Sequence, residues 1–542
     1  MLQPENQPKK YEALFTDIDT GRIKIPKFQR EFVWDKNQTA NLIDSIIKGY
    51  PVGTFILWKT RDELRYFKNI GNIELPSIPK GDAAYYVLDG QQRITSLYAV
   101  RKGAIISKDG IEIDYRDIYI NLDIDAEIDE EVVITEILND HTCISVHDLL
   151  KGSLVELVKK YNNDIHLERI DNYKKRLTGY DFSTIVISDY PIDIACEVFT
   201  RINTGGTELT LFEIMVAKTY DQNKKFDLSE KYDYLINNNG DGKDLEDVGF
   251  DTIPSSTVLQ CISAHLIKQI RRRDILKLKK EKVINSWGIV IDGLFTAIDY
   301  IRTHLRIPVS KLLPYNTLLV PFTYFFIRMK GKNPTQFQNK LLTQYFWWAS
   351  LSNRFTSGVE GKVALDLKIM DKILKEQKPS YKGEEVVLDL NDLKWHWFSA
   401  GEAFCKAILC LYAYHQPKSF SSDSIVNIRN DWLKVAFSKN YHHFFPKSYL
   451  KKNQYANDEA NVILNITIVD DNLNKREIGS NAPNIYMTKI SKENPNIDNT
   501  MKTHLINNLD TFGIWDNDYE KYLEKRGKKV IDELNKRLYP DI

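Results

Sequence analysis

The chain has 542 residues, in which 74 Lys and Arg balance 74 Asp and Glu, so its formal net charge is zero. This length suggests roughly three or four domains. A composition of 43% hydrophobic and 27% charged residues is typical of folded globular proteins and argues against a largely disordered chain. The even charge excludes a protein that coats nucleic acid through bulk positive charge, so any contact with DNA must use a local basic surface.

The cysteines, the N-terminal segment and the most apolar run point to a cytoplasmic protein. The five cysteines are scattered, without a C-x-x-C pair, which argues against a disulfide framework or a zinc ribbon and fits a reducing compartment. The polar start MLQPENQPKKYEALF shows no secretory signal. The most apolar run, residues 318–327, is too short to span a bilayer.

Residues 1–225 alternate between strand-like and helix-like patterns, which predicts a mixed α/β domain. A helix is expected from Asp35, with Gln38 completing a capping box, to Gly49. Two further helices are expected at residues 195–201 and 211–220, the second starting at a T-x-x-E capping box. The expected strands are residues 54–58, 85–88, 118–122 and 184–187.

Helical patterns dominate residues 226–395, the second predicted domain, and the tail from Tyr519 resembles a charged amphipathic helix. Residues 221–251 contain nine acidic and four basic residues, whereas residues 268–282 contain eight basic and two acidic residues. This change from acidic to basic residues indicates one of two arrangements. The charged residues lie either on two solvent-exposed helix faces or a loop, or along an edge of the protein that faces nucleic acid. The aromatic cluster at residues 345–348 is interpreted as helical core.

The third predicted domain, residues 396–542, contains an adjacent pair, His442 and His443, with Asn465 and Asn474 further along the chain. A pair of adjacent histidines alone usually has a structural role. Together with the two asparagines, however, the pair suggests a site that cleaves a phosphodiester with the help of a metal ion. A Mg²⁺ or Mn²⁺ ion at a scissile phosphate needs hard or borderline ligands that leave coordination positions open. A neutral imidazole can remove a proton from water.

The pattern H-x-F-P…N-I-T…N resembles the HNH, or ββα-metal, nuclease domain found at the C-terminus of GmrSD-type restriction enzymes. The resemblance implies that His443 is the general base and that Asn465 orients it. It also implies that His442 and Asn474 hold Mg²⁺ or Mn²⁺. The 22 residues from His443 to Asn465 exceed the spacing of minimal HNH fingers, so Asn461 is a competing candidate for the orienting asparagine.

A local charge count supports contact with phosphates near these histidines. Between Asp431 and Asp458 there are no acidic residues. The same interval contains five lysines, which are Lys434, Lys439, Lys447, Lys451 and Lys452. Lysines are suited to sequence-independent contacts with the DNA backbone.

Three strings stand out in the first region: IPKFQREFVWDKNQ (25–38), VLDGQQRITSL (87–97) and FTRINTGGTELT (199–210). The second joins a strand to a helix through Asp89 and Gly90, an arrangement that can cradle a phosphate, with Arg93 in the first helical turn. The alternative is a tight turn in which Asp89 caps the helix. No G-x-x-x-x-G-K-[ST] sequence is present, so nucleotide chemistry of the P-loop kind is excluded.

Together the three strings resemble the N-terminal domain of GmrSD-type enzymes, which has a ParB- and sulfiredoxin-like fold and uses a DGQQR motif for nucleotide binding and hydrolysis. The resemblance implies that Asp89 and Arg93 act directly on a nucleoside triphosphate, GTP or ATP. The residues that it assigns to the nucleotide are Gln29, Arg30, Asp89, Gly90, Gln91, Gln92, Arg93, Arg201 and Asn203.

The expected fold is therefore α+β and multidomain, with a ParB-like N-terminal domain, a helical middle and an HNH domain embedded in helices. The resemblance implies a DNA endonuclease or nickase regulated by NTP hydrolysis, acting in antiphage defence on double-stranded phage DNA that bears modifications. The alternative is a nucleotide-sensing factor that binds DNA or a partner and has a degenerate nuclease finger. Whether a second copy or a separate defence protein takes part is left open.

Overall fold

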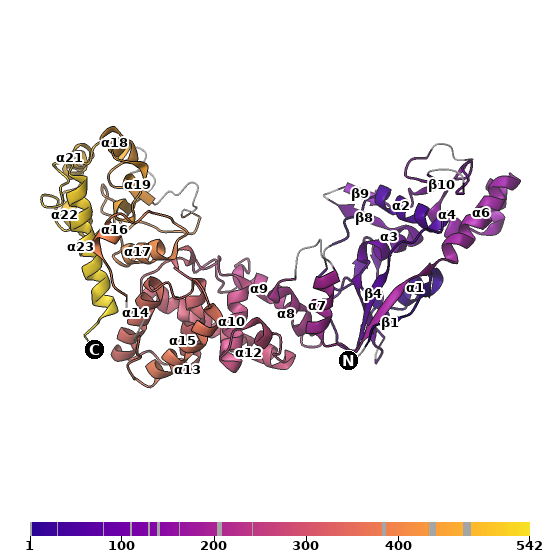
Figure 1. Ribbon diagram of the computed structural model, residues 1–542, viewed down its shortest axis with the longest axis horizontal. Coiled ribbons are helices and arrows are strands. Elements are labelled where there is room, and N and C mark those ends of the chain that lie inside the picture. Colours follow the sequence, from indigo (N-terminus) through magenta and orange to yellow (C-terminus); the bar gives the residue numbers. More distant parts are fainter. Residues whose placement is uncertain are drawn as a thin grey trace. The chain divides into compact units, whose positions relative to one another are not determined.

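The computed structural model describes residues 3–541 apart from residues 30, 80, 109–110, 128–130, 138–140, 162, 203–208, 241, 382–385, 432, 434–440 and 470–477. The chain divides into two compact units, Met1–Leu228 and Ser229–Ile542, which are described separately. Both helices and strands are present, which confirms the α+β class (Figure 1). Among the described residues, no helix combines the length and the apolar character that crossing a membrane requires.

A five-stranded mixed sheet forms the centre of the N-terminal unit, with the strand order β1-β14-β4-β7-β3. These strands are β1 (Glu5–Asn6), β3 (Ile23–Lys24), β4 (Phe55–Thr60), β7 (Ala84–Asp89) and β14 (Thr184–Ser188). β4 runs parallel to β14 and antiparallel to β7, and β7 runs parallel to β3. The predicted strands at 54–58, 85–88 and 184–187 are therefore confirmed, with differences of one or two residues at one or both ends.

Smaller strand pairings surround this sheet. The predicted strand at 118–122 is β10, at the centre of a three-stranded sheet with the order β11-β10-β12. The remaining strands of the unit are β2 (Lys9–Lys10), β5 (Asn69–Ile70), β6 (Ile73–Glu74), β8 (Ile105–Lys108), β9 (Ile111–Asp114), β10 (Tyr119–Asn121), β11 (Val133–Ile134), β12 (Cys143–Ser145) and β13 (Asp181–Phe182).

Two helices of the N-terminal unit, α2 and α8, begin where their capping residues predict. The side chain of Asp35 accepts a hydrogen bond from the backbone N–H of Gln38 at 2.7 Å, and the Gln38 side chain accepts one from the Asp35 N–H. A second capping box joins Thr210 and Glu213. The helices are α1 (Tyr11–Asp19), α2 (Lys36–Ile47), α3 (Gln91–Lys102), α4 (Val146–Lys151), α5 (Leu154–Lys160), α6 (Asp164–Thr178), α7 (Ile192–Ile202) and α8 (Leu211–Thr219).

One hydrophobic core joins these helices to the sheet. It includes Phe15 of α1, Ile43 of α2, Ile94 of α3, Phe55 of β4 and Val87 of β7, all of which are buried. Because α3 follows β7 after the single residue Gly90, the DGQQR string lies where the sheet, α3 and their shared core meet.

The C-terminal unit is mainly helical. Its helices up to residue 414 are α9 (Leu228–Ile236), α10 (Ser255–Ile267), α11 (Arg272–Ile275), α12 (Lys280–Thr303), η1 (Ser310–Leu312), η2 (Asn316–Leu318), α13 (Leu319–Met329), α14 (Gln336–Leu351), α15 (Val359–Leu374), α16 (Leu390–Lys394) and α17 (Ala403–Tyr414). The aromatic cluster at residues 345–348 is buried on α14, as predicted. The apolar run at 318–327 forms most of α13, a buried helix of this unit.

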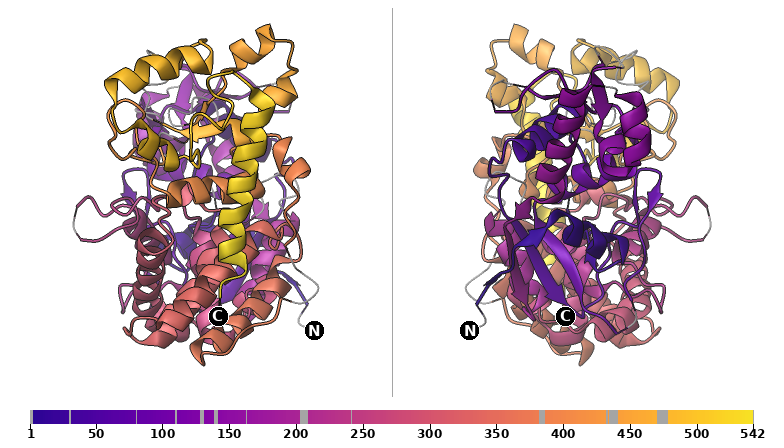
Figure 2. Two further views of the ribbon diagram at one scale, coloured as in Figure 1. Left: turned by 90° about the vertical axis from the view of Figure 1, so that its left-hand side faces the viewer. Right: turned by 90° about the vertical axis from the view of Figure 1, so that its right-hand side faces the viewer.

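The last part of the unit combines two short strands with helices. Strand β15 (Tyr441–His443) runs antiparallel to β16 (Ile466–Ile468) and places His443 opposite Ile466. The helices here are α18 (Lys447–Lys452), α19 (Asn457–Ala460), η3 (Ile463–Asn465), α21 (Pro483–Glu493), α22 (Ile497–Lys502) and α23 (Tyr519–Leu538). The predicted amphipathic tail is α23, the long yellow helix in Figure 2, which packs on α14, α16 and η3.

Candidate functional site

The imidazole of His443 lies at the end of β15 and is held by an asparagine. Its Nε2 atom is 2.9 Å from Oδ1 of Asn461. The ring is largely enclosed by protein, and this burial lowers the pKa of His443 to about 4 because it penalises the charged form. The imidazole is therefore neutral near pH 7, which is the form that can accept a proton.

The hydrogen bonds around Asn461 decide which nitrogen of His443 carries the proton. Nδ2 of Asn461 donates to the carbonyl of Phe398 at 3.0 Å, so Oδ1 must be the atom that faces His443. The backbone N–H of Phe398 donates in return to the Asn461 carbonyl at 2.7 Å. An oxygen acceptor at Nε2 requires the Nε2–H tautomer, which leaves the lone pair of His443 on Nδ1.

Asn465 has a different role from the one implied by the resemblance. Its side chain is fully buried, and its Oδ1 accepts a hydrogen bond from the Phe445 N–H at 2.8 Å. Its Nδ2 donates to the carbonyls of Phe445 and Ala460 at 2.9 and 3.0 Å. Asn465 thus fixes the backbone that follows β15, whereas Asn461, the competing candidate, binds the ring of His443.

His442, one of the two predicted metal ligands, is not brought together with the His443 ring. His442 precedes His443 on β15, and successive strand residues point to opposite faces, so the two side chains leave the strand in opposite directions. A metal ion held by His442 would therefore lie on the face of β15 opposite to the His443 ring, and His442 is only 6% exposed. Asn474 falls within residues 470–477, outside the described part.

Three of the five lysines predicted to contact phosphate lie on α18, directly after the histidine pair. Lys451 and Lys452 are exposed, and Lys447 begins the helix after Pro446. The charge of Lys447 contributes to lowering the pKa of His443, and burial lowers the pKa of Lys447 itself. A positive charge therefore lies near the imidazole. Lys434 and Lys439 lie outside the described residues.

A buried arginine, which the sequence did not identify, supports the same region from α23. Nη1 of Arg526 donates to the carbonyls of Leu464 and Ile466 at 2.6 and 2.7 Å, on either side of Asn465. Its guanidinium also lies over the ring of Tyr412, with the central carbon 4.5 Å from the ring centroid. Its position in the sequence could have indicated that this arginine is buried. Arg526 lies four residues after Tyr522 and four before Val530, and therefore on the apolar face of the helix.

In the N-terminal unit the structure brings the three sequence strings together. The buried side chain of Gln29 donates a hydrogen bond to the Val87 carbonyl. The amide of Gln92 accepts from the Val33 N–H at 2.8 Å and donates to the Glu31 carbonyl at 3.1 Å. The third string joins the other two through α7, where the ring of Phe199 packs edge-on against Phe28 at 5.3 Å.

The guanidinium of Arg93 is bound to protein groups, whereas the sequence predicted contact with a phosphate. Nη1 donates to the Val52 carbonyl at 2.5 Å, and Nη2 donates to the Thr54 carbonyl at 3.1 Å. Nη2 also pairs with the Asp89 carboxylate at 3.2 Å. Asp89 does not cap α3, because the N-cap residue is Gly90, with φ of 89°. Arg93 therefore joins α3 to the segment 52–54 before β4, and its ion pair with Asp89 joins α3 to β7.

The other predicted nucleotide residues are only partly placed. Gln91 is buried, and its Oε1 accepts a hydrogen bond from Gln92 at 3.0 Å. Arg201, near the end of α7, is exposed and pairs with Glu197 at 2.6 Å. Arg30 and Asn203 lie outside the described residues.

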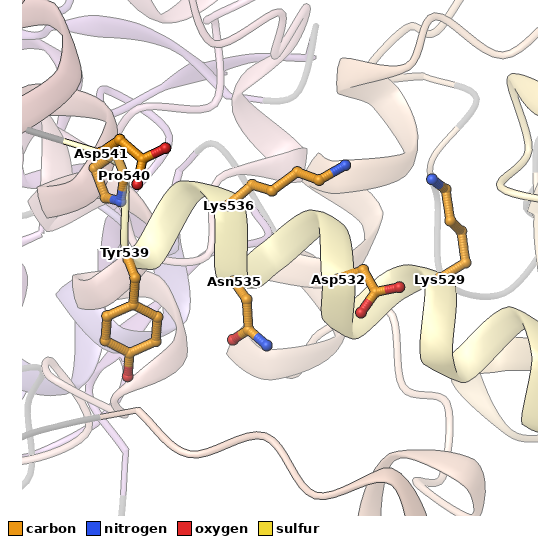
Figure 3. Close-up of a pocket in the computed structure, with 7 residues that line it drawn as sticks. All are labelled: Lys529, Asp532, Asn535, Lys536, Tyr539, Pro540 and Asp541. Carbon is orange, nitrogen blue, oxygen red and sulfur yellow. The ribbon is translucent and has the colours of Figure 1, made fainter.

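A surface hollow of about 550 Å³ along the end of α23 contains none of the predicted site residues. It is lined by Lys529, Asp532, Asn535, Lys536, Tyr539, Pro540 and Asp541. Lys529 and Lys536 extend to one side of the helix and Asn535 and Tyr539 to the other, so their polar groups do not converge (Figure 3). We therefore place the candidate site at His443 and, in the N-terminal unit, at the DGQQR string.

Two comparisons with known proteins bear on these sites. The chain is 24% identical to an uncharacterized protein of Methanocaldococcus jannaschii, over 95% of this chain and 96% of the relative. Residues 11–220 match the family model described as the GmrSD restriction endonuclease, N-terminal domain. The matched segment contains all three strings of the N-terminal unit. The match supports a restriction-type nuclease role for the chain.

Proposed function

We propose that this protein is a metal-dependent DNA endonuclease or nickase in which His443 is the general base. The observation that carries the proposal is the amide clamp on the imidazole: Asn461, itself oriented by Phe398, fixes the proton of His443 on Nε2. The lone pair on Nδ1 can then accept a proton from a water molecule that attacks a phosphodiester. Burial keeps the ring neutral for this task.

The order of elements around His443 supports a nuclease finger. Strand β15 carries the base and pairs with β16, with α18, α19 and η3 in the connection between the two strands, and α21 is the next described α-helix after β16. This is the ββα order of the HNH resemblance. Asn465 and Arg526 hold the backbone of the two strands, so the position of the base is set by rigid, buried groups.

The chemistry of the proposed donors fits Mg²⁺ or Mn²⁺. Asn474 offers a hard amide oxygen and His442 a borderline imidazole nitrogen, and these donor types suit such ions. The bound ion would stabilise negative charge on the scissile phosphate. Because His442 leaves β15 on the face opposite to His443, Asn474 is the stronger candidate for the ligand next to the base.

We further propose that the N-terminal unit binds and hydrolyses GTP or ATP and controls cleavage of modified phage DNA. The match of residues 11–220 to the GmrSD N-terminal domain supports this part of the proposal. The Arg93 side chain binds the carbonyls of residues 52 and 54 and the Asp89 carboxylate, so the backbone at Gly90 and the start of α3 is the part of the string that we expect to face phosphates.

The test of the nuclease is the nicking of supercoiled plasmid with Mg²⁺ or Mn²⁺. Wild type is compared with His443→Ala, Asn474→Ala and His442→Ala, and with His141→Ala, an exposed histidine of the other unit, as the matched control. We expect the first two variants to lose cleavage and the control to retain it. Equal cleavage by wild type and His443→Ala would end the assignment.

The second test compares modified and unmodified phage DNA, with and without each nucleotide. Cleavage that requires both the modification and one NTP is the expected result. Tight binding of DNA or nucleotide without cleavage under any metal condition would instead favour the alternative, a sensing factor with a degenerate finger. If the Asp89→Ala variant hydrolyses the nucleotide at the wild-type rate, Asp89 has no role in nucleotide hydrolysis.

A further inference from the structure

A histidine, a glutamate and a cysteine meet between α16 and α17 of the C-terminal unit, apart from the residues assigned above. Nε2 of His396 lies 3.1 Å from a carboxylate oxygen of Glu402, and Sγ of Cys405 lies 3.2 Å from the same oxygen. All three donor atoms lie within 4.8 Å of one another. In Figure 1 this segment is found between the labels α16 and α17.

The distances suit a small cation with tetrahedral preference. Zinc binds sulfur at about 2.3 Å and nitrogen or oxygen at about 2.0–2.2 Å, so two of its ligands lie roughly 3.4–3.6 Å apart. The observed separations of 3.1 and 3.2 Å are those of hydrogen bonds, and they would lengthen by only a few tenths of an ångström around an ion. The backbone N–H of Ser399 already donates to the Cys405 sulfur at 3.5 Å, as is usual around a metal-bound thiolate.

The ligand types select the class of metal. A thiolate and an imidazole favour zinc over magnesium or calcium, which take oxygen ligands. A neutral His396, an ionised Glu402 and a Cys405 thiolate together carry two negative charges, which a divalent ion neutralises.

We propose that His396, Glu402 and Cys405 bind a zinc ion, with solvent completing the coordination. The side chain of Glu402 is 44% exposed, which gives an ion and a water molecule access to the site. In the absence of a metal, burial raises the pKa of the Cys405 thiol to about 12. Metal binding therefore releases the thiol proton to solvent and strengthens as the pH rises.

A zinc ion at this site would affect the position of Asn461, because residues 396–405, which carry the three ligands, also contact Asn461. The carbonyl of His396 accepts a hydrogen bond from the Ile463 N–H at 2.9 Å, and the Phe398 carbonyl accepts one from the Asn461 side chain. A zinc ion on the His396 and Cys405 side chains would stiffen residues 396–405. This would keep the amide of Asn461 in the orientation that fixes the proton of His443.

The experiment titrates the full-length, metal-free protein with Co²⁺ as a spectroscopic substitute for zinc. We expect one equivalent of Co²⁺ to produce thiolate-to-cobalt charge-transfer absorption in the near ultraviolet, and Zn²⁺ to displace it. Cys405→Ser should abolish the band, and Glu402→Gln should weaken Co²⁺ binding at least tenfold. Because the Glu402 side chain is 44% exposed and Cys405 is buried, that second variant is expected to fold even if Cys405→Ser does not.

The matched controls separate this site from other cysteines and from the proposed nuclease metal. Cys410→Ser alters a buried cysteine of the same helix whose sulfur donates to the Leu312 carbonyl, and it should leave the band unchanged. His443→Ala should also leave it unchanged, whatever its effect on cleavage. A wild-type protein that gives no thiolate band, or a band that survives in Cys405→Ser, would overturn the proposal.

Discussion

Asn461 and Asn465 have the same side chain and lie four residues apart, yet the structure gives them different tasks. Asn461 is 6% exposed and its side chain contacts the His443 ring. Asn465 is fully buried and makes three hydrogen bonds to backbone groups of Phe445 and Ala460. One asparagine therefore acts on the base and the other on the framework.

Alanine substitutions should separate these two roles. We expect Asn461→Ala to fold and to lose cleavage by roughly tenfold to a hundredfold, as is typical when an orienting partner of a functional histidine is removed. Asn465→Ala should lower stability by about 2–4 kcal/mol because it leaves buried backbone groups unpaired. Single-turnover nicking rates and thermal unfolding of both variants check this. A normal melting temperature for Asn465→Ala would contradict the assigned role.

The low pKa of His443 predicts an unusual pH profile for cleavage. Burial lowers this pKa to about 4, so the ring stays neutral throughout the range from about pH 5.5 to 8. Protonation of the base should therefore not reduce the cleavage rate near pH 6.5, where an exposed histidine would titrate. Nicking rates measured across this range at constant ionic strength and metal concentration test the prediction. A tenfold fall in rate with an apparent pKa near 6.5 would contradict it.

At the scale of helices and strands, the sequence predicted two helix starts correctly. It was less successful in predicting which groups the polar side chains contact. The capping boxes at Asp35 and Thr210 depend on neighbours three residues away, so local sequence is enough to find them. The partners of Arg93 are carbonyls of residues 52 and 54, about forty positions earlier in the chain. No local pattern reveals such a contact, so the arginine was expected at a phosphate.

The same reasoning explains the exchange of Asn461 and Asn465. Spacing from His443 left both asparagines as candidates, and the choice between them depends on Phe398, more than sixty residues earlier. The contact of Arg526 with the carbonyls of Leu464 and Ile466 is equally distant in sequence. The strands of the N-terminal unit were predictable from their own residues, whereas the groups that orient the His443 ring were not.

Gln92 offers a test of how the strings of the N-terminal unit depend on one another. Its buried amide binds the backbone of Glu31 and Val33 and so ties α3 to the first string. Gln92→Ala leaves both backbone groups without this partner, and we expect a loss of about 1–3 kcal/mol together with weaker nucleotide binding. Thermal unfolding and binding of a fluorescent NTP analogue measure the two effects.

The matched control is Gln38→Ala, which removes the exposed side-chain half of a capping box on α2. It should cost only a few tenths of a kcal/mol to about 1 kcal/mol and leave nucleotide binding intact. If Gln92→Ala and Gln38→Ala behave alike in both measurements, the amide of Gln92 does not organise the nucleotide site.

At the scale of the whole molecule, a net charge of zero is compatible with DNA cleavage because positive charge is concentrated locally. In the described part of the finger, the basic residues next to His443 are those of α18, including the exposed Lys451 and Lys452. Because these few lysines can neutralise only a few phosphates, we expect the affinity for unmodified DNA to be low and to fall only slightly as the salt concentration rises. Such a protein would rely on recognition or nucleotide state to engage its substrate.

Three partly or fully buried histidines are expected to make the C-terminal unit sensitive to acid. Burial lowers the pKa of His415 and His443 to about 4 and that of His504 to about 3. In the unfolded chain each would titrate near 6.5, so below that pH the unfolded state binds more protons than the folded state. The stability that these neutral rings contribute is complete above about pH 6.5 and is lost as the pH falls toward 4.

The expected loss is about 1.4 kcal/mol per pH unit for each histidine between these pKa values. Urea unfolding at pH 7.5, 6.0 and 5.0 can follow this unit by tryptophan fluorescence, because seven of the nine tryptophans lie in it. His504→Asn should make the pH dependence shallower, because the ring of His504 is the most strongly shifted of the three. An unfolding midpoint that stays constant from pH 7.5 to 5.0 would show that these rings are not held neutral by the fold.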